Sequence, residues 1–382
     1  MSRLPGLDLM RAIAILWVLL YHGIVLGLGS PLPALAQLGW MGVDLFFVLS
    51  GFLIGAQWLA ACQDGKPAPF GDFYLRRAFR ILPAYLVIVA IYFALPSLRE
   101  RPLIQPLWQF LSFTENLLID FSKPKAFSHV WSLCVEEHFY LAFPVLAWLL
   151  LKRPSWQKTV AVCVAIVVAG MALRAHLWNS ELAAIQASGN PGQLARRYYE
   201  LIYYPSWTRL DGLLMGVLLA IIKVYRPTLW TRMLARPQVL LVAGALLLWG
   251  AIQLFAADLA YAPAVYGYPL LSLAWALIVA SAASRQGWLG RWQLPGIGAI
   301  ATLAFSLYLS HKLVFAALKT QFGPLFAEHG ALAFASYAIG ALLVAALLYW
   351  GVEKPFLRLR DRLLGKQADS ASARPALAAN TI

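Results

Sequence analysis

Long apolar stretches separated by short polar segments run through the whole chain. Each stretch approaches the length of about 20 residues that an α-helix needs to cross the hydrocarbon core of a bilayer. They predict an all-α polytopic membrane protein with about ten transmembrane helices. The predicted spans are residues 8–28, 39–62, 81–97, 134–151, 159–178, 207–224, 237–256, 265–283, 297–317 and 331–351.

Composition agrees with this pattern. Of the 382 residues, 61% are hydrophobic and 13% are charged, and the mean hydropathy is +0.69. A water-soluble protein of this length cannot bury so much apolar surface. Membrane lipid is therefore an expected partner.

The net charge of +14 reflects basic residues in short tracts between the apolar stretches. This arrangement is typical of the positive-inside rule, and we expect no nucleic-acid partner. With the N-terminus inside, the inner segments hold about three times as many Lys and Arg residues as the outer ones. The sequence thus predicts an even number of spans with both termini cytoplasmic.

Residues 1–366 read as one membrane domain, and the Ala/Ser-rich segment 367–382 predicts a disordered cytoplasmic tail. Two outer loops, about 98–133 and 179–206, are long but too short for a separate catalytic domain. The three cysteines lie in or beside apolar stretches without the spacing of metal ligands, so we expect no metal site.

Ionisable residues inside the predicted spans are the candidate functional groups. Each costs about 2.5–3.5 kcal/mol on insertion scales, so each is expected to have a partner or a role. Those that the topology places in the outer half of the membrane are His22, Asp44, Glu136, Glu137, Arg209, Asp211 and His311.

Several interpretations of these residues stay open. His22 is either a hydrogen-bonded core residue or a proton-transfer group. Glu136 and Glu137 point about 100° apart on a helix, so one is expected to face a site while the other pairs with Arg209 or Arg174. Arg209 and Asp211 are either a structural ion pair or part of a binding site.

A second cluster, Arg76, Arg77 and Arg80, lies on the predicted inner side. Arg77 and Arg80 are three residues apart and share one helical face. Guanidinium pairs bind phosphates through bidentate hydrogen bonds, so a polyanionic ligand fits this cluster. Basic residues beside a span also mark topology or contact anionic lipid.

Two classes of function fit these groups. An enzyme would take an activated donor from the cytoplasm and transfer its group outward. A proton-coupled transporter of a glycan or an acyl-bearing small molecule would use the same carboxylates and histidine as a proton relay.

Ordered motifs favour the enzyme. The chain resembles the acyltransferase-3 family of integral membrane acyltransferases in seven blocks over residues 3–363. They are RLPGLDLMRAIAILWVLLYHG (3–23), GWMGVDLFFVLSGFLIG (39–55), FYLRRAFRILPAYL (73–86), VWSLCVEEHFYLAFPVL (130–146), TRLDGLLMGVLLA (208–220), SLYLSHKLV (306–314) and VEKPFLRLRDRL (352–363).

The resemblance implies transfer of an acyl group, commonly acetyl, from acyl-coenzyme A to a hydroxyl, without a metal. It implies a surface or exported carbohydrate acceptor, such as O-antigen, peptidoglycan, exopolysaccharide or glucan, which can be lipid-linked. Some relatives acylate small natural products. The bacterial inner membrane is the expected location. Departures at His138 and Ser310 bear on acceptor choice.

The resemblance and the residue analysis together assign site roles. We expect catalysis by His22, Glu136 and Glu137, and coenzyme A binding by Arg76, Arg77 and Arg80. The expected substrate-binding residues are Arg11, Asp44, Trp131, Arg209, Asp211 and His311.

In the expected mechanism His22 is the general base or an acyl-carrying nucleophile. Glu136 or Glu137 orients it, with Asp44 as the next candidate. Arg209 or a backbone N–H stabilises the oxyanion.

Overall fold

A computed structural model describes residues 4–28, 32–63, 69–123, 125–152, 155–256, 259–328 and 330–377. Nine helices in this part of the chain are long and apolar enough to cross a membrane. The count is ten when α10 and α11, bent by 111°, form one broken span. The predicted all-α multi-pass fold is therefore confirmed, whereas the cytoplasmic location of the termini stays a prediction.

The long helices follow the predicted spans in order. They are α1 (Pro5–Val25), α3 (Met41–Ala61), α4 (Phe70–Ala94), α6 (Trp131–Leu151), α7 (Trp156–Leu177), α10 (Asp211–Tyr225), α11 (Pro227–Leu234), α12 (Pro237–Ala256), α13 (Tyr268–Ala283), α15 (Ile297–Glu328), α16 (Gly330–Leu348) and α17 (Lys354–Leu377). Short helices lie between them, including α2 (Pro33–Gln37), α5 (Leu107–Leu111), α8 (Ala183–Ala187), α9 (Pro191–Tyr198) and α14 (Trp288–Arg291).

Three boundaries differ markedly from the prediction. Helix α15 ends at Glu328, whereas the sequence predicts the span to end at residue 317. Helix α4 begins at Phe70, whereas the sequence predicts the span to begin at residue 81. The arginine cluster therefore lies inside the helix. Hydropathy does not detect the first part of α4, residues 70–80, because the arginines lower the mean hydropathy there. Helix α17 continues to Leu377, into the segment predicted as a disordered tail, and residues 378–382 lie outside the described part. The disorder of that tail stays a prediction.

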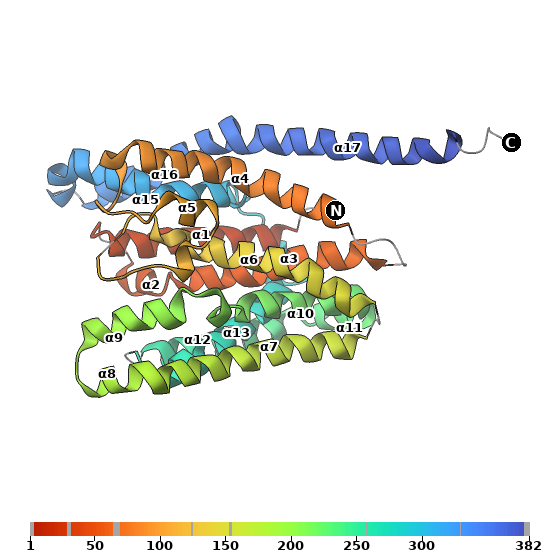
Figure 1. Cartoon of the computed structure of the whole chain (residues 1–382), viewed down its shortest axis with the longest axis horizontal. Helices are drawn as coiled ribbons and strands as arrows, with labels where there is room; N and C mark the ends of the chain where they lie inside the picture. The colour runs from red at the N-terminus through yellow and green to blue at the C-terminus, as the bar shows by residue number, and fades with distance from the viewer. Residues whose placement is uncertain are drawn as a thin grey trace.

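The helices run side by side along the long axis of the molecule (Figure 1). Helices α2, α8 and α9 lie at the left end of this view, and α11 and the projecting α17 lie at the right end. The spans of α3, α13 and α15 are the most buried, and those of α7 and α12 the least. Exposed Val239, Val242, Leu246 and Trp249 form one face of α12, as expected for a lipid-facing helix.

Helices α3 and α10 approach each other closely because glycines lie between them. A Cβ atom added at Gly51 would lie 2.0 Å from the carbonyl oxygen of Leu213. One added at Gly216 would lie 2.3 Å from the carbonyl oxygen of Val48. Small residues commonly allow such backbone contact between membrane helices, where dispersion forces depend on close approach.

Two buried ion pairs connect α3, α7 and α10. Arg209 donates to Asp44 at 2.9 Å, and Arg174 makes a bidentate pair with Asp211 at 2.9 and 3.1 Å. All four residues are at most 3% exposed. Arg209 and Asp211, considered above as a pair with each other, instead have partners on different helices. Residues two apart in sequence do not face each other on a helix.

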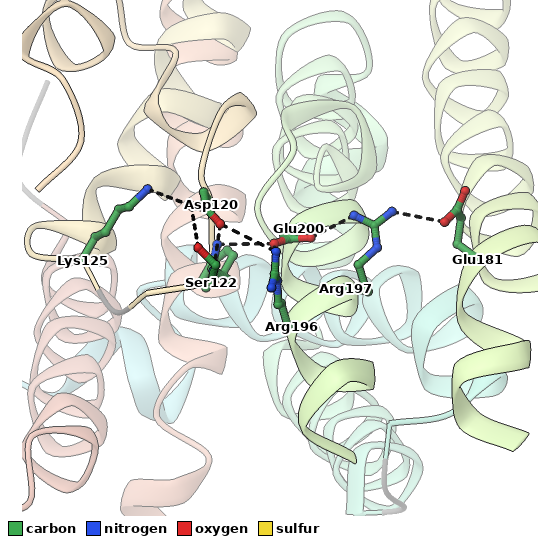
Figure 2. Close-up of polar contacts among 8 residues, drawn as sticks. Asp120, Ser122, Lys125, Glu181, Arg196, Arg197 and Glu200 are labelled. Carbon is green, nitrogen blue, oxygen red and sulfur yellow. Dashed lines mark hydrogen bonds and ion pairs between the residues drawn. The ribbon is translucent and has the colours of Figure 1, made fainter. Parts of the chain in front are cut away.

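An ion-pair network joins the two long segments at about 98–133 and 179–206, as Figure 2 shows. Arg196 contacts Asp120 at 3.7 Å and Glu200 at 3.0 Å, and Arg197 contacts Glu200 at 2.9 Å. Burial raises the pKa of Glu200, but hydrogen bonds from Arg196 and Arg197 outweigh it and lower this pKa. The network therefore holds the two loops together at neutral pH.

We expect Gly51→Ala and Gly216→Ala to destabilise the bundle by about 1–3 kcal/mol, because each Cβ would force α3 and α10 apart. Thermal unfolding in detergent measures this. Gly250→Ala is the matched control, since a Cβ there meets nothing within 4 Å. Equal melting temperatures for all three variants would contradict the close packing.

We expect Asp44→Leu to destabilise the protein by about 3–5 kcal/mol, because it leaves the Arg209 charge buried without its partner. The double variant Asp44→Leu/Arg209→Met should recover much of this loss. Glu181→Gln, which breaks a partly exposed pair with Arg197, should cost less than about 1 kcal/mol. Unfolding in detergent compares them, and a double variant no better than Asp44→Leu would argue against the pair.

Candidate active site

A cavity of about 510 Å³ lies among α1, α3, α4, α6, α15 and α17. Its walls combine apolar residues with charged ones from four of these helices, α1, α4, α6 and α17. The charged lining residues are Asp8, Arg11, Arg77, Arg80, Glu136 and Arg360. Four of these six residues are arginines, so the cavity can accommodate an anionic ligand.

The predicted phosphate-binding arginines do not all reach this cavity. Arg77 and Arg80 line it, as their shared helical face predicts, whereas Arg76 is exposed and is not among the lining residues. Arg360 of α17 lies there instead. The sequence analysis missed it because α17 packs against α4 only in the tertiary fold.

Arg80 is held by a buried carboxylate that the sequence analysis also missed. Its guanidinium forms an ion pair with Glu353, which is 1% exposed, and Ser306 Oγ donates to the other Glu353 oxygen at 2.9 Å. The available signal was an acidic residue at the end of an apolar span, within the quoted block at 352–363. Glu353 therefore fixes Arg80 at the cavity wall.

The two adjacent glutamates separate as helix geometry predicts. Glu136 lines the cavity and accepts hydrogen bonds from Ser50 Oγ at 2.9 Å and Tyr140 OH at 2.5 Å. Glu137 is not among the lining residues, and its Oε1 atom is buried without a hydrogen-bond partner in the described part of the chain. Only Glu136 is thus available to a ligand in this cavity.

His22 pairs with a second histidine. Its Nδ1 atom lies 2.8 Å from Nε2 of His311, and the two rings stack with centroids 4.8 Å apart. The expected pairing of His22 with Glu136, Glu137 or Asp44 is therefore wrong in this structure: Glu136 bonds Ser50 and Tyr140, and Asp44 bonds Arg209. The sequence analysis expected Glu136 beside His22, whereas the structure places it in the cavity with Arg77 and Arg80. Sequence position does not give the helix that faces each group.

The hydrogen bonds of His311 determine the proton positions of the pair. Its Nδ1 atom lies 3.0 and 2.9 Å from the carbonyl oxygens of Leu307 and Tyr308, which can only accept. In neutral His311 the proton is therefore on Nδ1, and Nε2 accepts from Nδ1–H of His22. The Nε2 lone pair of His22 is then the one that remains available as a base.

A third histidine, which the sequence analysis did not single out, completes the cluster. The ring centroid of His129 lies 5.8 Å from that of His22 and 4.9 Å from that of His311. Its Nε2 atom bonds the carbonyl oxygen of Tyr308 at 3.0 Å. The missed signal is helical spacing, because His129, Ser132, Glu136 and Tyr140 repeat on one face of the span.

One end of the arginine-lined cavity lies next to residues that contact this histidine cluster. Its lining includes Ser132 and Tyr308, whose hydroxyls lie 2.6 Å apart. Tyr308 is one turn before His311, and its hydroxyl also bonds the carbonyl oxygen of His129. The Ser132–Tyr308 pair thus lies between the arginine-lined cavity and the histidines.

The other predicted substrate-binding residues form structural contacts. Arg209, the expected oxyanion donor, bonds Asp44 and lies against the rings of Tyr268 at 4.0 Å, Tyr203 at 4.5 Å and Trp131 at 5.2 Å. Asp211 pairs with Arg174. None of Asp44, Trp131, Arg209 and Asp211 lines the arginine cavity, whereas Arg11 does, beside Asp8 at 3.2 Å.

Among the described residues, no group of three or more His, Cys, Asp or Glu side chains is arranged to hold a metal ion. The histidine cluster is instead organised by hydrogen bonds to backbone carbonyls. Its available chemistry is proton transfer or nucleophilic attack by an imidazole.

The chain is similar to known proteins over most of its length. Residues 4–350 match the family described as "Acyltransferase domain". The chain is 27% identical to the peptidoglycan O-acetyltransferase OatA of Listeria monocytogenes, over 80% of this chain and 48% of the relative. It is 26% identical to a Staphylococcus aureus protein provisionally named as an O-acetyltransferase, over 93% of this chain and 58% of the relative.

A Bacillus subtilis protein, provisionally named as a peptidoglycan O-acetyltransferase, is 29% identical over 57% of this chain and 33% of the relative. The chain spans between about a third and somewhat more than half of the length of these curated relatives. No solved structure matches it. Since the family match covers nearly all of the membrane-spanning part, the chain belongs to the acyltransferase-3 family of integral membrane acyltransferases.

Proposed function

We propose that the chain transfers an acyl group, acetyl in particular, from acyl-coenzyme A to a hydroxyl of a surface or exported carbohydrate. The observation that carries this proposal is the His22–His311 pair beside a cavity lined by arginines. The relatives' names support O-acetylation of a glycan such as peptidoglycan. The bacterial inner membrane is the proposed location.

The arginine cavity is the proposed site of the donor. Arg77, Arg80 and Arg360 would hold coenzyme A phosphates, with Arg80 positioned by Glu353. Arg11 and His22 are eleven residues apart on α1, or about 16 Å along the helix. A long donor arm would let the thioester reach the histidines while the phosphates stay with the arginines.

His22 is the proposed general base. Its Nε2 atom would remove the proton of the acceptor hydroxyl as the oxygen attacks the thioester carbonyl. The C–S bond then breaks, the ester forms, and the proton passes from His22 to the leaving thiolate. His311 would orient His22 and share its positive charge through the Nδ1–H hydrogen bond, as the third member of a triad does.

A covalent variant uses the same atoms. His22 Nε2 would attack the thioester carbonyl, the C–S bond would break, and coenzyme A would leave as a thiolate. The acceptor oxygen would then attack the acyl group, the N–C bond to His22 would break, and the hydroxyl proton would pass to the thiolate. Either course needs Nε2 of His22 unprotonated, which the hydrogen bonds of His311 favour.

We expect His22→Ala to lower transfer by about 10²–10⁴-fold, because the proton acceptor is lost. Purified protein in detergent is assayed for thioester loss and ester formation with acetyl-coenzyme A and a soluble glycan. Coenzyme A binding, measured separately by calorimetry, should survive. His176→Ala is a control, since that ring is exposed on α7 and does not line the arginine cavity.

Normal transfer by His22→Ala would overturn the assignment. Solute flux across liposomes without loss of a thioester would instead favour the transporter considered above. Ester formation on a small natural product, and not on a glycan, would retain the enzyme class but change the acceptor.

We expect Arg77→Ala/Arg80→Ala to raise the KM for acetyl-coenzyme A by about tenfold or more, because charge-assisted hydrogen bonds to phosphate are lost. Glu353→Gln should raise the same KM by a smaller factor than the double variant, because Arg80 is retained but loses the ion pair that positions it. Arg76→Ala is the matched control on the exposed face of α4. An unchanged donor KM in the double variant would exclude a coenzyme A site at these arginines.

A further inference from the structure

A second cavity, of about 240 Å³, contains a group of charges that the proposed mechanism does not use. It lies between the end of α1 and the loop at 99–128, and Lys312 of α15 reaches it. Its cationic residues are Arg101, Lys123, Lys125 and Lys312, and its acidic residues are Glu100 and Asp120. Cations thus outnumber acids in its lining.

Both acids already have partners within the protein. Glu100 accepts from Tyr92 OH at 3.0 Å and from the backbone N–H of Phe127 at 2.9 Å. Asp120 accepts from Ser122, and these hydrogen bonds, with the charges of Lys125 and Arg196, lower its pKa to about 2. Figure 2 shows Asp120 with Lys125 and Arg196 in the loop network.

Lys312 is the buried cation of this lining, and it has no ion-pair partner in the described part of the chain. It is 5% exposed, and its hydrogen bond in the described part of the chain is to Ser128 Oγ at 3.5 Å. An ammonium carries three N–H donors, and Lys312 forms no ion pair within 4 Å among the described residues. The charges of Glu100 and Glu115 act on it from a longer distance. A buried ammonium with one long hydrogen bond is a favourable site for an anion, because the anion would replace the hydration that the ammonium lost on burial.

This charge lies beside the histidine cluster. Lys312 follows His311 directly, and Ser128 precedes His129. Leu26, one turn after His22, also lines the second cavity. The charge of Lys312 acts on all three imidazoles. None of the three histidines lines this cavity, but a molecule bound in it would lie about one helical turn from His22, on the other side of His22 from Arg11.

We propose that the second cavity is the acceptor subsite and that Lys312 binds an acidic group of the acceptor glycan. This inference rests on the proposed acyltransferase function and adds the class of acceptor: a sugar with a carboxylate or other anionic substituent. Arg101, Lys123 and Lys125 at the mouth attract the same group. The position of Lys312 places a neighbouring hydroxyl of that sugar beside His22.

The test uses the full chain in detergent with acetyl-coenzyme A and a matched pair of acceptors. These are a short glycan with a free carboxylate and the same glycan as its methyl ester. Wild type should favour the free acid by about tenfold or more in kcat/KM for the acceptor, as expected for a charge-assisted hydrogen bond. Lys312→Met should bring the ratio close to one, and Lys312→Arg should restore most of it.

Lys158→Met, an exposed lysine outside both cavities, is the control and should retain the wild-type ratio. The acid-to-ester ratio is measured within each variant, so a general loss of activity or of folded protein does not move it. Should Lys312→Met not fold, Lys312→Gln and Lys123→Gln give the same comparison.

The inference is overturned if wild type uses the acid and the ester equally, or if Lys312→Met keeps the preference. Repeating the assay in nanodiscs of neutral and of anionic lipid separates the two sources of a negative group. A Lys312-dependent response to anionic lipid with no acceptor preference would identify a lipid headgroup and also overturn it. Absence of transfer to either glycan, with no thioester loss, would instead reject the proposed function itself.

Discussion

A charge placed among membrane helices must find a partner, and this requirement organises the bundle. Arg174 with Asp211 and Arg209 with Asp44 connect α7, α10 and α3 through groups that are at most 3% exposed. Each guanidinium without its carboxylate would be a costly buried charge. The pairs therefore determine the register of three helices, and the glycine contacts between α3 and α10 allow the close approach that they require.

Once these pairs are satisfied, the polar groups that remain stand out as candidates for chemistry. His22, His129 and His311 lie together above the Ser132–Tyr308 hydrogen bond, where the arginine cavity ends. Lys312 extends the cluster toward the second cavity. Along α1, His22 thus lies between the two cavities, with Arg11 lining one cavity and Leu26 lining the other.

The use of His311 in place of a carboxylate has a physical consequence. A neutral imidazole whose proton is fixed by backbone carbonyls can orient His22 without adding a negative charge to the membrane interior. Glu136, bonded to Ser50 and Tyr140, instead adds an acidic group to the arginine cavity. The carboxylates and histidines of the quoted motifs thus occupy two neighbouring places rather than one catalytic triad.

The sequence by itself determined the helical class, the order of the spans, the family and which residues would be ionisable within the membrane. Hydropathy depends only on composition along the chain, and helical spacing placed Arg77 with Arg80 and separated Glu136 from Glu137. Only the tertiary structure decided the partners: Asp211 with Arg174, Asp44 with Arg209, His22 with His311, and Arg80 with Glu353. Helical periodicity defines the face on which a side chain lies, and its place in the sequence defines its position along the helix. Its partner depends on which helix packs opposite. Contacts between residues far apart in the chain make that choice.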